Sequence, residues 1–249
     1  MQIKSIIVGL VSYLTMAFGA QAADTTITVR VLAKDAKFIG TSMDGAEVII
    51  RDAETREILA EGMTAGGTGD TGLIMKTPRT RYGSITSEDA AQFTATFDLH
   101  APRLIEVSAR GPMNPNTSAV TATSQQWVMP GKHITEGDAW LLELRGLVVE
   151  VLDLAPEIAA GELKLHAKVR MLCGCPTEPG GLWDADKMEI KALLENEGTV
   201  AEIPLMFTGE TSHFAATVPV EKGTYKATFY AYQPSTGNTG VYISSFIVP

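Results

Sequence analysis

The feature that most constrains the fold of this chain is a repeated alternation of apolar and polar residues. A period of two places every second side chain on the same face, as in a half-buried β-strand. The alternation recurs along the whole chain, and Gly, Pro, Asn and Asp residues separate the segments. The clearest alternating segments are residues 26–33, 46–51, 93–99, 104–110, 163–171, 188–194, 199–207 and 214–220.

Helical periodicity is scarce. Residues 86–92 are the one segment for which we expect a short helical turn, beginning at Ser87. The chain ends with a strand pattern, a polar Pro-Ser-Thr-Gly-Asn turn and a final strand that runs to Val248. Many short strands with turn residues between them favour an all-β sandwich over an α/β fold.

The N-terminus has the form of a signal peptide. Lys4 supplies a positive charge, residues 6–18 are mostly apolar, and Ala20-Gln21-Ala22 is an A-x-A cleavage site. The apolar stretch is shorter than the roughly 20 residues that a membrane span needs. We therefore expect cleavage after Ala22, a mature chain without a membrane span, and a periplasmic or secreted location.

Charge narrows the classes of partner. The formal net charge is -9, and removal of a leader that contains Lys4 and no acidic residue makes it -10. An acidic chain without a Lys/Arg cluster is a poor match for nucleic acid or an anionic membrane. The expected partner is another periplasmic protein or a metalloenzyme.

The length of the mature chain, 227 residues (249 minus 22), suits two domains of ordinary size. After a signal peptide at 1–22, we expect an N-terminal β-sandwich domain at 23–153. A long loop at 63–92 with little strand character interrupts it. A C-terminal β-sandwich domain occupies 154–249, and the junction lies near 153–160.

Two segments resemble known families of sandwich domain. Gly223 and Tyr225 give a Gly-x-Tyr entry into the penultimate strand, and a hairpin leads into the last one. This resembles the end of immunoglobulin-like and fibronectin-type domains. The segment "DGAEVIIRDAETREILAEGMT" at 44–64 resembles the Gly-Ala-x-Val and Asp-x-x-Thr pattern of transthyretin-like and carboxypeptidase-regulatory domains. These resemblances imply two tandem immunoglobulin-like sandwiches with an accessory, non-enzymatic role.

The main chemical lead is "RMLCGCPTEPGGLWDADK" at 170–187, which holds both cysteines, Cys173 and Cys175. In an extended strand these residues would be about 6.5–7 Å apart at Cα, at the upper edge of disulfide reach. Gly174 permits the bend that a bond needs. The closed loop is so short that loop entropy would add little stability. A local disulfide that only shapes a turn is one interpretation.

Metal binding is a second interpretation. Met171, Cys173 and Cys175 share one face of the predicted strand, so their sulfurs can converge, and thiolate with thioether suits Cu(I). Zinc would require further ligands. His166 has the opposite parity from Met171, and no sequence feature brings His213 to the cysteines.

Thiol–disulfide exchange is a third interpretation, because a bond across one residue is readily reduced. The helix that activates the thiol in thioredoxin-type Cys-x-x-Cys sites has no counterpart here. All three interpretations of the Cys173–Cys175 pair stay open at the level of sequence.

Other patterns carry little chemistry. The Gly-rich segment 64–74 lacks the Gly-Lys-Ser/Thr ending of a phosphate loop. Asp184 and Asp186 lack the oxygen-rich loop of a strong calcium site. His100 and His133 fall in predicted loops, as surface histidines do. There is no Gly-x-Ser-x-Gly motif, so we expect a protein that is not an enzyme.

Overall fold

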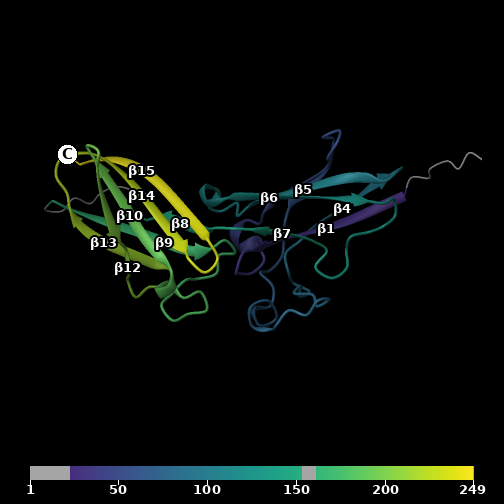
Figure 1. Ribbon diagram of the computed structural model, residues 1–249, viewed down its shortest axis with the longest axis horizontal. Coiled ribbons are helices and arrows are strands. Elements are labelled where there is room, and N and C mark those ends of the chain that lie inside the picture. The colour runs from purple at the N-terminus through teal and green to yellow at the C-terminus, as the bar shows by residue number, and fades with distance from the viewer. Residues whose placement is uncertain (1–22, 153–160, 249) are drawn as a thin grey trace, which may run out of the picture.

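The computed structural model describes residues 23–152 and 161–248 (Figure 1). The predicted signal peptide at 1–22 and the expected junction at 153–160 lie outside the described residues.

The described residues are organised as strands joined by turns and a few single-turn helices. The strands are β1 (Ala23–Ala33), β2 (Glu47–Asp52), β3 (Ile58–Met63), β4 (Phe93–Leu99), β5 (Arg103–Gly111), β6 (Val120–Val128), β7 (Trp140–Leu144), β8 (Leu147–Val151), β9 (Glu162–Met171), β10 (Glu189–Asn196), β11 (Thr199–Pro204), β12 (Met206–Phe207), β13 (His213–Pro219), β14 (Gly223–Gln233) and β15 (Asn238–Val248). The short helices are η1 (Thr41–Met43), η2 (Gly72–Lys76), η3 (Asn116–Ser118) and η4 (Ala185–Lys187). None of these helices is long and apolar enough to cross a membrane.

The strands form four sheets. Two sheets, in the orders β4-β1-β7 and β3-β2-β5-β6, make up the N-terminal half; β11-β10-β14-β15 and β12-β13-β9-β8 make up the C-terminal half. The two halves lie at opposite ends of the long axis (Figure 1). β1 pairs with β7 in parallel, and the other strand pairs are antiparallel. The all-β prediction is confirmed, and the four sheets are consistent with β-sandwich architecture. The immunoglobulin-like assignment of each half stays a prediction.

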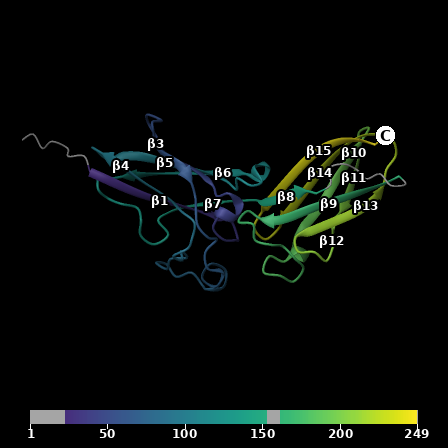
Figure 2. The same cartoon turned by 180° about the vertical axis from the view of Figure 1, so that it is seen from behind.

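β9 shows how the alternation produces the fold. Its apolar residues from Leu163 to Met171 are buried on one face. The intervening residues, from Lys164 to Arg170, lie on the other face and are partly or fully exposed. β9 has β8 on one side and β13 on the other (Figure 2).

The helical turn expected at 86–92 is reduced to one hydrogen-bonded turn, in which the amide of Ala90 donates to the carbonyl of Ser87 at 3.0 Å. These residues form turns and two isolated bridges, and the short helix of this region is η2. The guanidinium of Arg30 explains part of the difference, because its Nη1 donates to the carbonyl of Ala90 at 2.7 Å. The loop 63–92 also packs against Leu32 and Phe38 to form a small core separate from the main one. That core consists of Leu32, Phe38, Ile74, Ile85, Ala90 and Ala91.

The strand-like run at 140–151 divides at Arg145 and Gly146. β7 pairs with β1 in the N-terminal half, whereas β8 pairs with β9 in the C-terminal half. Gly146, in the link where the chain changes sheets, has φ +159°, a conformation that favours glycine. The sheets therefore divide before Leu147, upstream of the expected junction at 153–160.

Candidate functional site

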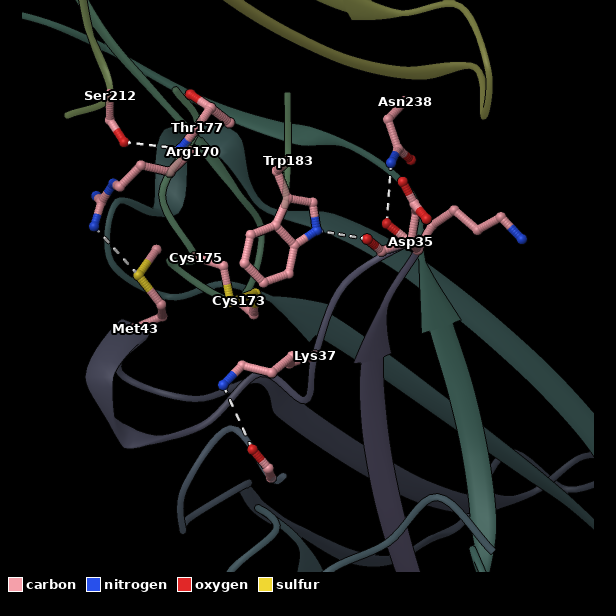
Figure 3. The surroundings of a disulfide bond; sticks show 12 residues. Asp35, Lys37, Met43, Arg170, Cys173, Cys175, Thr177, Trp183, Ser212 and Asn238 are labelled. Carbon is pink, nitrogen blue, oxygen red and sulfur yellow. Dashed lines mark hydrogen bonds between the residues drawn. A yellow bond between two sulfur atoms is a disulfide. The ribbon is translucent and has the colours of Figure 1, made fainter. Parts of the chain in front are cut away.

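The Cys-Gly-Cys segment is a tight turn at the end of β9. The amide of Gly174 donates to the carbonyl of Met171 at 2.8 Å, and the amide of Met171 donates to the carbonyl of Cys175 at 3.0 Å. Gly174 has φ +81°. This turn brings the Cα atoms of Cys173 and Cys175 to 5.4 Å, inside the range that a disulfide needs, and the two sulfurs are joined as a disulfide (Figure 3).

The disulfide turn is buried against the N-terminal half. Cys173 is 1% exposed, Cys175 is 7% exposed, and Met171 is fully buried. A Cβ atom on Gly174 would lie 2.6 Å from the Sδ of Met43, in η1. The turn and η1 therefore pack closely, although more than 100 residues separate them in the sequence.

Hydrogen bonds around the turn connect the two halves. The indole Nε1 of Trp183 donates to the carbonyl of Asp35 at 2.7 Å (Figure 3). The side-chain amide of Gln233 donates to the carboxylate of Asp35, also at 2.7 Å. The Nη1 of Arg170 lies 3.6 Å from the Sδ of Met43. Trp183 is buried, as expected for a large aromatic side chain, and its polar atom is satisfied.

Asn238 adds a second connection between the halves. Its side chain is fully buried. Its Nδ2 donates to the carbonyl of Lys34 at 3.0 Å, and its Oδ1 accepts from the amide of Gly146 at 3.2 Å. Asn238 therefore holds the end of β1, the β7–β8 link and the start of β15 together. The disulfide turn, Trp183 and Asn238 form what we call the junction cluster.

Met171, Cys173 and Cys175, the sulfur set predicted for copper, lie in one buried turn. Cys173 and Cys175 lie together, but as a disulfide their sulfurs lack the thiolate charge that binds metals. Met43 supplies a further sulfur beside the turn, which was not predicted from the sequence. No local pattern could have found it, because the contact depends on how the two halves pack. Within residues 23–152 and 161–248, no group of three or more His, Cys, Asp or Glu side chains is arranged to hold a metal ion.

Two histidines lie together on the outer face of the C-terminal half. The Nδ1 of His213 is 3.2 Å from the Nε2 of His166, and the ring centroids are 5.2 Å apart. His166 lies on the opposite face of β9 from Met171, as its parity in the strand predicted. Its proximity to His213 was not predicted, because the register between β9 and β13 cannot be read from either strand alone.

The carboxylate of Asp184 stabilises a turn. Its Oδ1 accepts from the amides of Gly180 at 2.8 Å and Asp186 at 3.1 Å. The bond from the Gly180 amide is the main cause of a lowered pKa at Asp184. The nearby Lys187 and the Asp186 amide lower it further. The carboxylate is occupied in shaping the loop that follows the disulfide turn.

Comparison with known proteins adds no family to these findings. No protein-family model matches the chain, and no curated protein matches it significantly. The resemblances to transthyretin-like and immunoglobulin-like domains remain resemblances of short segments. The conclusions about function therefore depend on the geometry of the chain itself.

Proposed function

We propose that this chain is an exported, non-enzymatic accessory protein that binds another protein, and that its disulfide turn fixes the arrangement of the two halves. The observation that carries this proposal is the burial of Cys173 and Cys175 at the contact with Met43. A disulfide turn buried at the contact between the two halves would hold them in one fixed arrangement, as a rigid binding protein needs. It offers little access to a substrate.

An apolar strip on β15 is the proposed binding surface. Val241, Ile243 and Ile247 alternate along this outermost strand of its sheet, and each is about half exposed or more, with 48%, 58% and 70% of its surface accessible. Exposed apolar side chains that gather on one face are typical of protein–protein contacts, and in this strip Ser245 separates Ile243 from Ile247. The partner proposed is a protein of the same exported compartment.

A lysine substitution in the strip tests the proposed surface. Ile243→Lys should abolish capture of a specific partner from the exported fraction of the source cells. The matched control is Val200→Lys, because Val200 is 56% exposed on β11, at the other edge of the same sheet. Equal capture by the wild type and both variants would contradict the proposed surface.

The disulfide turn is tested separately with a Cys173→Ser/Cys175→Ser variant. We expect both halves to stay folded. Amide hydrogen exchange should become faster at Gly174 and Gly146, whose amides donate to Met171 and Asn238 within the junction cluster. Unchanged exchange at both positions would show that the disulfide does not fix the junction.

Copper binding by the reduced protein is the second candidate function. The specific observation in its favour is the Sδ of Met43 beside the turn that carries Met171, Cys173 and Cys175. Thioethers and thiolates together suit Cu(I). Anaerobic Cu(I) titration against a chromophoric chelator should show tight one-to-one binding by the reduced protein. The double serine variant should lose that binding if the hypothesis is correct.

Thiol–disulfide exchange remains the third interpretation of the same pair. Equilibration of Cys173 and Cys175 with glutathione buffers would give the reduction potential of the disulfide. An oxidising potential in the range of known exchange proteins would favour this interpretation.

A further inference from the structure

We propose that His166 and His213 form a binding site for a divalent transition-metal ion such as Zn²⁺, with Glu210 as a third ligand. This site lies on the outer face of the C-terminal half and is independent of the cysteines and of the proposed protein-binding role.

The strand register creates the histidine pair. His166 on β9 faces Ala215 on β13, and His213 faces Lys168. His213 is therefore two residues from the position opposite His166 and on the same face of the sheet. Diagonal neighbours of this kind are within reach of long side chains across an antiparallel pair. Because Ala215 is small, it leaves room for the two imidazole rings to meet.

The spacing of the two nitrogens fits two ligands of one ion. Zinc lies about 2.0–2.1 Å from an imidazole nitrogen. Two such nitrogens are about 3.3–3.4 Å apart at a tetrahedral angle and about 2.9 Å apart at a right angle. The observed 3.2 Å between His213 Nδ1 and His166 Nε2 falls between these values. On binding, the ion would replace the proton shared by the two nitrogens, and that proton would move to the other nitrogen of its own ring.

Glu210 supplies an adjacent carboxylate. Its Oε2 lies 3.5 Å from the Nδ1 of His213. The amide of His213 donates to the carbonyl of Glu210 at 3.0 Å, so a tight turn holds the two residues side by side. The Glu210 side chain is 72% exposed, so few neighbours restrict its approach to the ion. Imidazole and carboxylate ligands suit zinc and neighbouring divalent ions better than they suit Cu(I).

Three such ligands are not preassembled in the described residues, so the site is completed on binding. The surrounding charges are mixed. Lys168 faces His213 across the strands and opposes a cation, and the Glu150 carboxylate opposite Lys168 on β8 is ion-paired with Arg170. The arrangement favours a reversible site that water completes over a closed structural site.

Isothermal titration of the full chain with Zn²⁺ tests the proposal. We expect one ion per chain and a loss of at least tenfold in affinity for both His166→Gln and His213→Gln. Glu210→Gln should weaken binding several-fold. His100→Gln, on an exposed loop, is the matched control and should bind like the wild type, as should Cys173→Ser/Cys175→Ser.

Zinc binding retained by either His166→Gln or His213→Gln would overturn the proposal, as would equal loss in His100→Gln. The imidazole nitrogen resonances of the wild-type protein give a test that needs no substitution. Zinc should shift the signals of His166 and His213 and leave those of His100 and His133 unchanged. Shifts confined to His100 or His133, or no shift at all, would also overturn it.

Discussion

Gly174 shows how much one residue decides in the disulfide turn. Its φ of +81° is costly for any residue with a Cβ, and a Cβ atom would lie 2.6 Å from the Sδ of Met43. Two physical effects therefore act at one position: the backbone conformation and the contact with η1. A glycine is required here both to close the turn and to let the two halves meet.

Substitution of Gly174 separates these two effects. Gly174→Ala should lower the free energy of unfolding by about 2–3 kcal/mol, of which about 1–2 kcal/mol is the left-handed backbone. Gly180→Ala is the matched control, because Gly180 has φ +69° and no atom lies within 4 Å of the place that a Cβ would occupy. The Gly180→Ala variant should lose only the part of the free energy of unfolding that comes from the left-handed backbone. Urea denaturation of both variants measures the difference. Equal losses in the free energy of unfolding would show that the Met43 side chain can move aside with no measurable destabilisation.

Asp52 accounts for the Asp-x-x-Thr resemblance in the N-terminal half. Its Oδ1 accepts from the amides of Thr55 at 2.8 Å and Glu54 at 2.9 Å. These bonds, with that from Thr55 as the largest contributor, lower the pKa of Asp52. The motif therefore predicts a local turn between β2 and β3, and the structure shows that turn. It carries no information about function.

At the scale of elements, strands were predictable where a local pattern determines them. Residues 93–99 coincide with β4, and the alternation in residues 163–171 gives the two faces of β9. The predictions that failed concern residues whose conformation depends on partners far away in the sequence. The segment 86–92 forms only one turn, because bridges to Ala65 and Gly67 and the bond from Arg30 to the carbonyl of Ala90 hold it extended. Likewise, only strand pairing reveals that His166 and His213 meet.

Asp138 fixes part of the loop 63–92 to the segment before β7. Its Oδ1 accepts from the hydroxyl of Ser84 at 2.6 Å, from the hydroxyl and amide of Thr86 at 2.7 and 3.1 Å, and from the amide of Ile85 at 2.9 Å. Burial favours the neutral acid, but these hydrogen bonds outweigh it and lower the pKa of Asp138. The charged carboxylate is therefore the form that holds the loop in place.

The stabilisation by Asp138 should depend on pH. A lowered pKa in the folded state means that the contribution is complete above the unfolded pKa of about 3.9 and is lost as the pH falls through the folded pKa. Asp138→Asn keeps the oxygen but removes the charge. It should lower the free energy of unfolding by about 1–2 kcal/mol at pH 7.

Urea denaturation between pH 3 and pH 7 measures this difference. The difference in the free energy of unfolding between the wild type and Asp138→Asn should become smaller at the acid end of the range. The control is Asp24→Asn, at an exposed position in β1, which should leave the free energy of unfolding at pH 7 unchanged. A gap for Asp138→Asn that stays constant with pH would contradict the assigned role of the charge.

At the scale of the whole molecule, the two halves share one continuous core. Buried residues of the N-terminal half, such as Met43 and Leu144, belong to the same apolar cluster as Leu172 and Cys173 of the C-terminal half. The polar bonds of Trp183 and Asn238 also join the two halves, and both side chains are buried. A joint with both an apolar core and satisfied polar groups should move little, which fits the proposed role as a rigid binding body.

Asn238→Ala should weaken this joint without removing a strand. The substitution leaves the amide of Gly146 and the carbonyl of Lys34 without their partner, and buried polar groups left in this way cost about 1–3 kcal/mol each. We expect a loss of about 2–4 kcal/mol in the free energy of unfolding and faster amide exchange at Gly146. Asn116→Ala, at an exposed position in η3, is the control and should change neither quantity. If Asn238→Ala behaves like the control, the Asn238 bonds do not hold the halves together, and the apolar contact around the buried disulfide turn becomes the main element that fixes their arrangement.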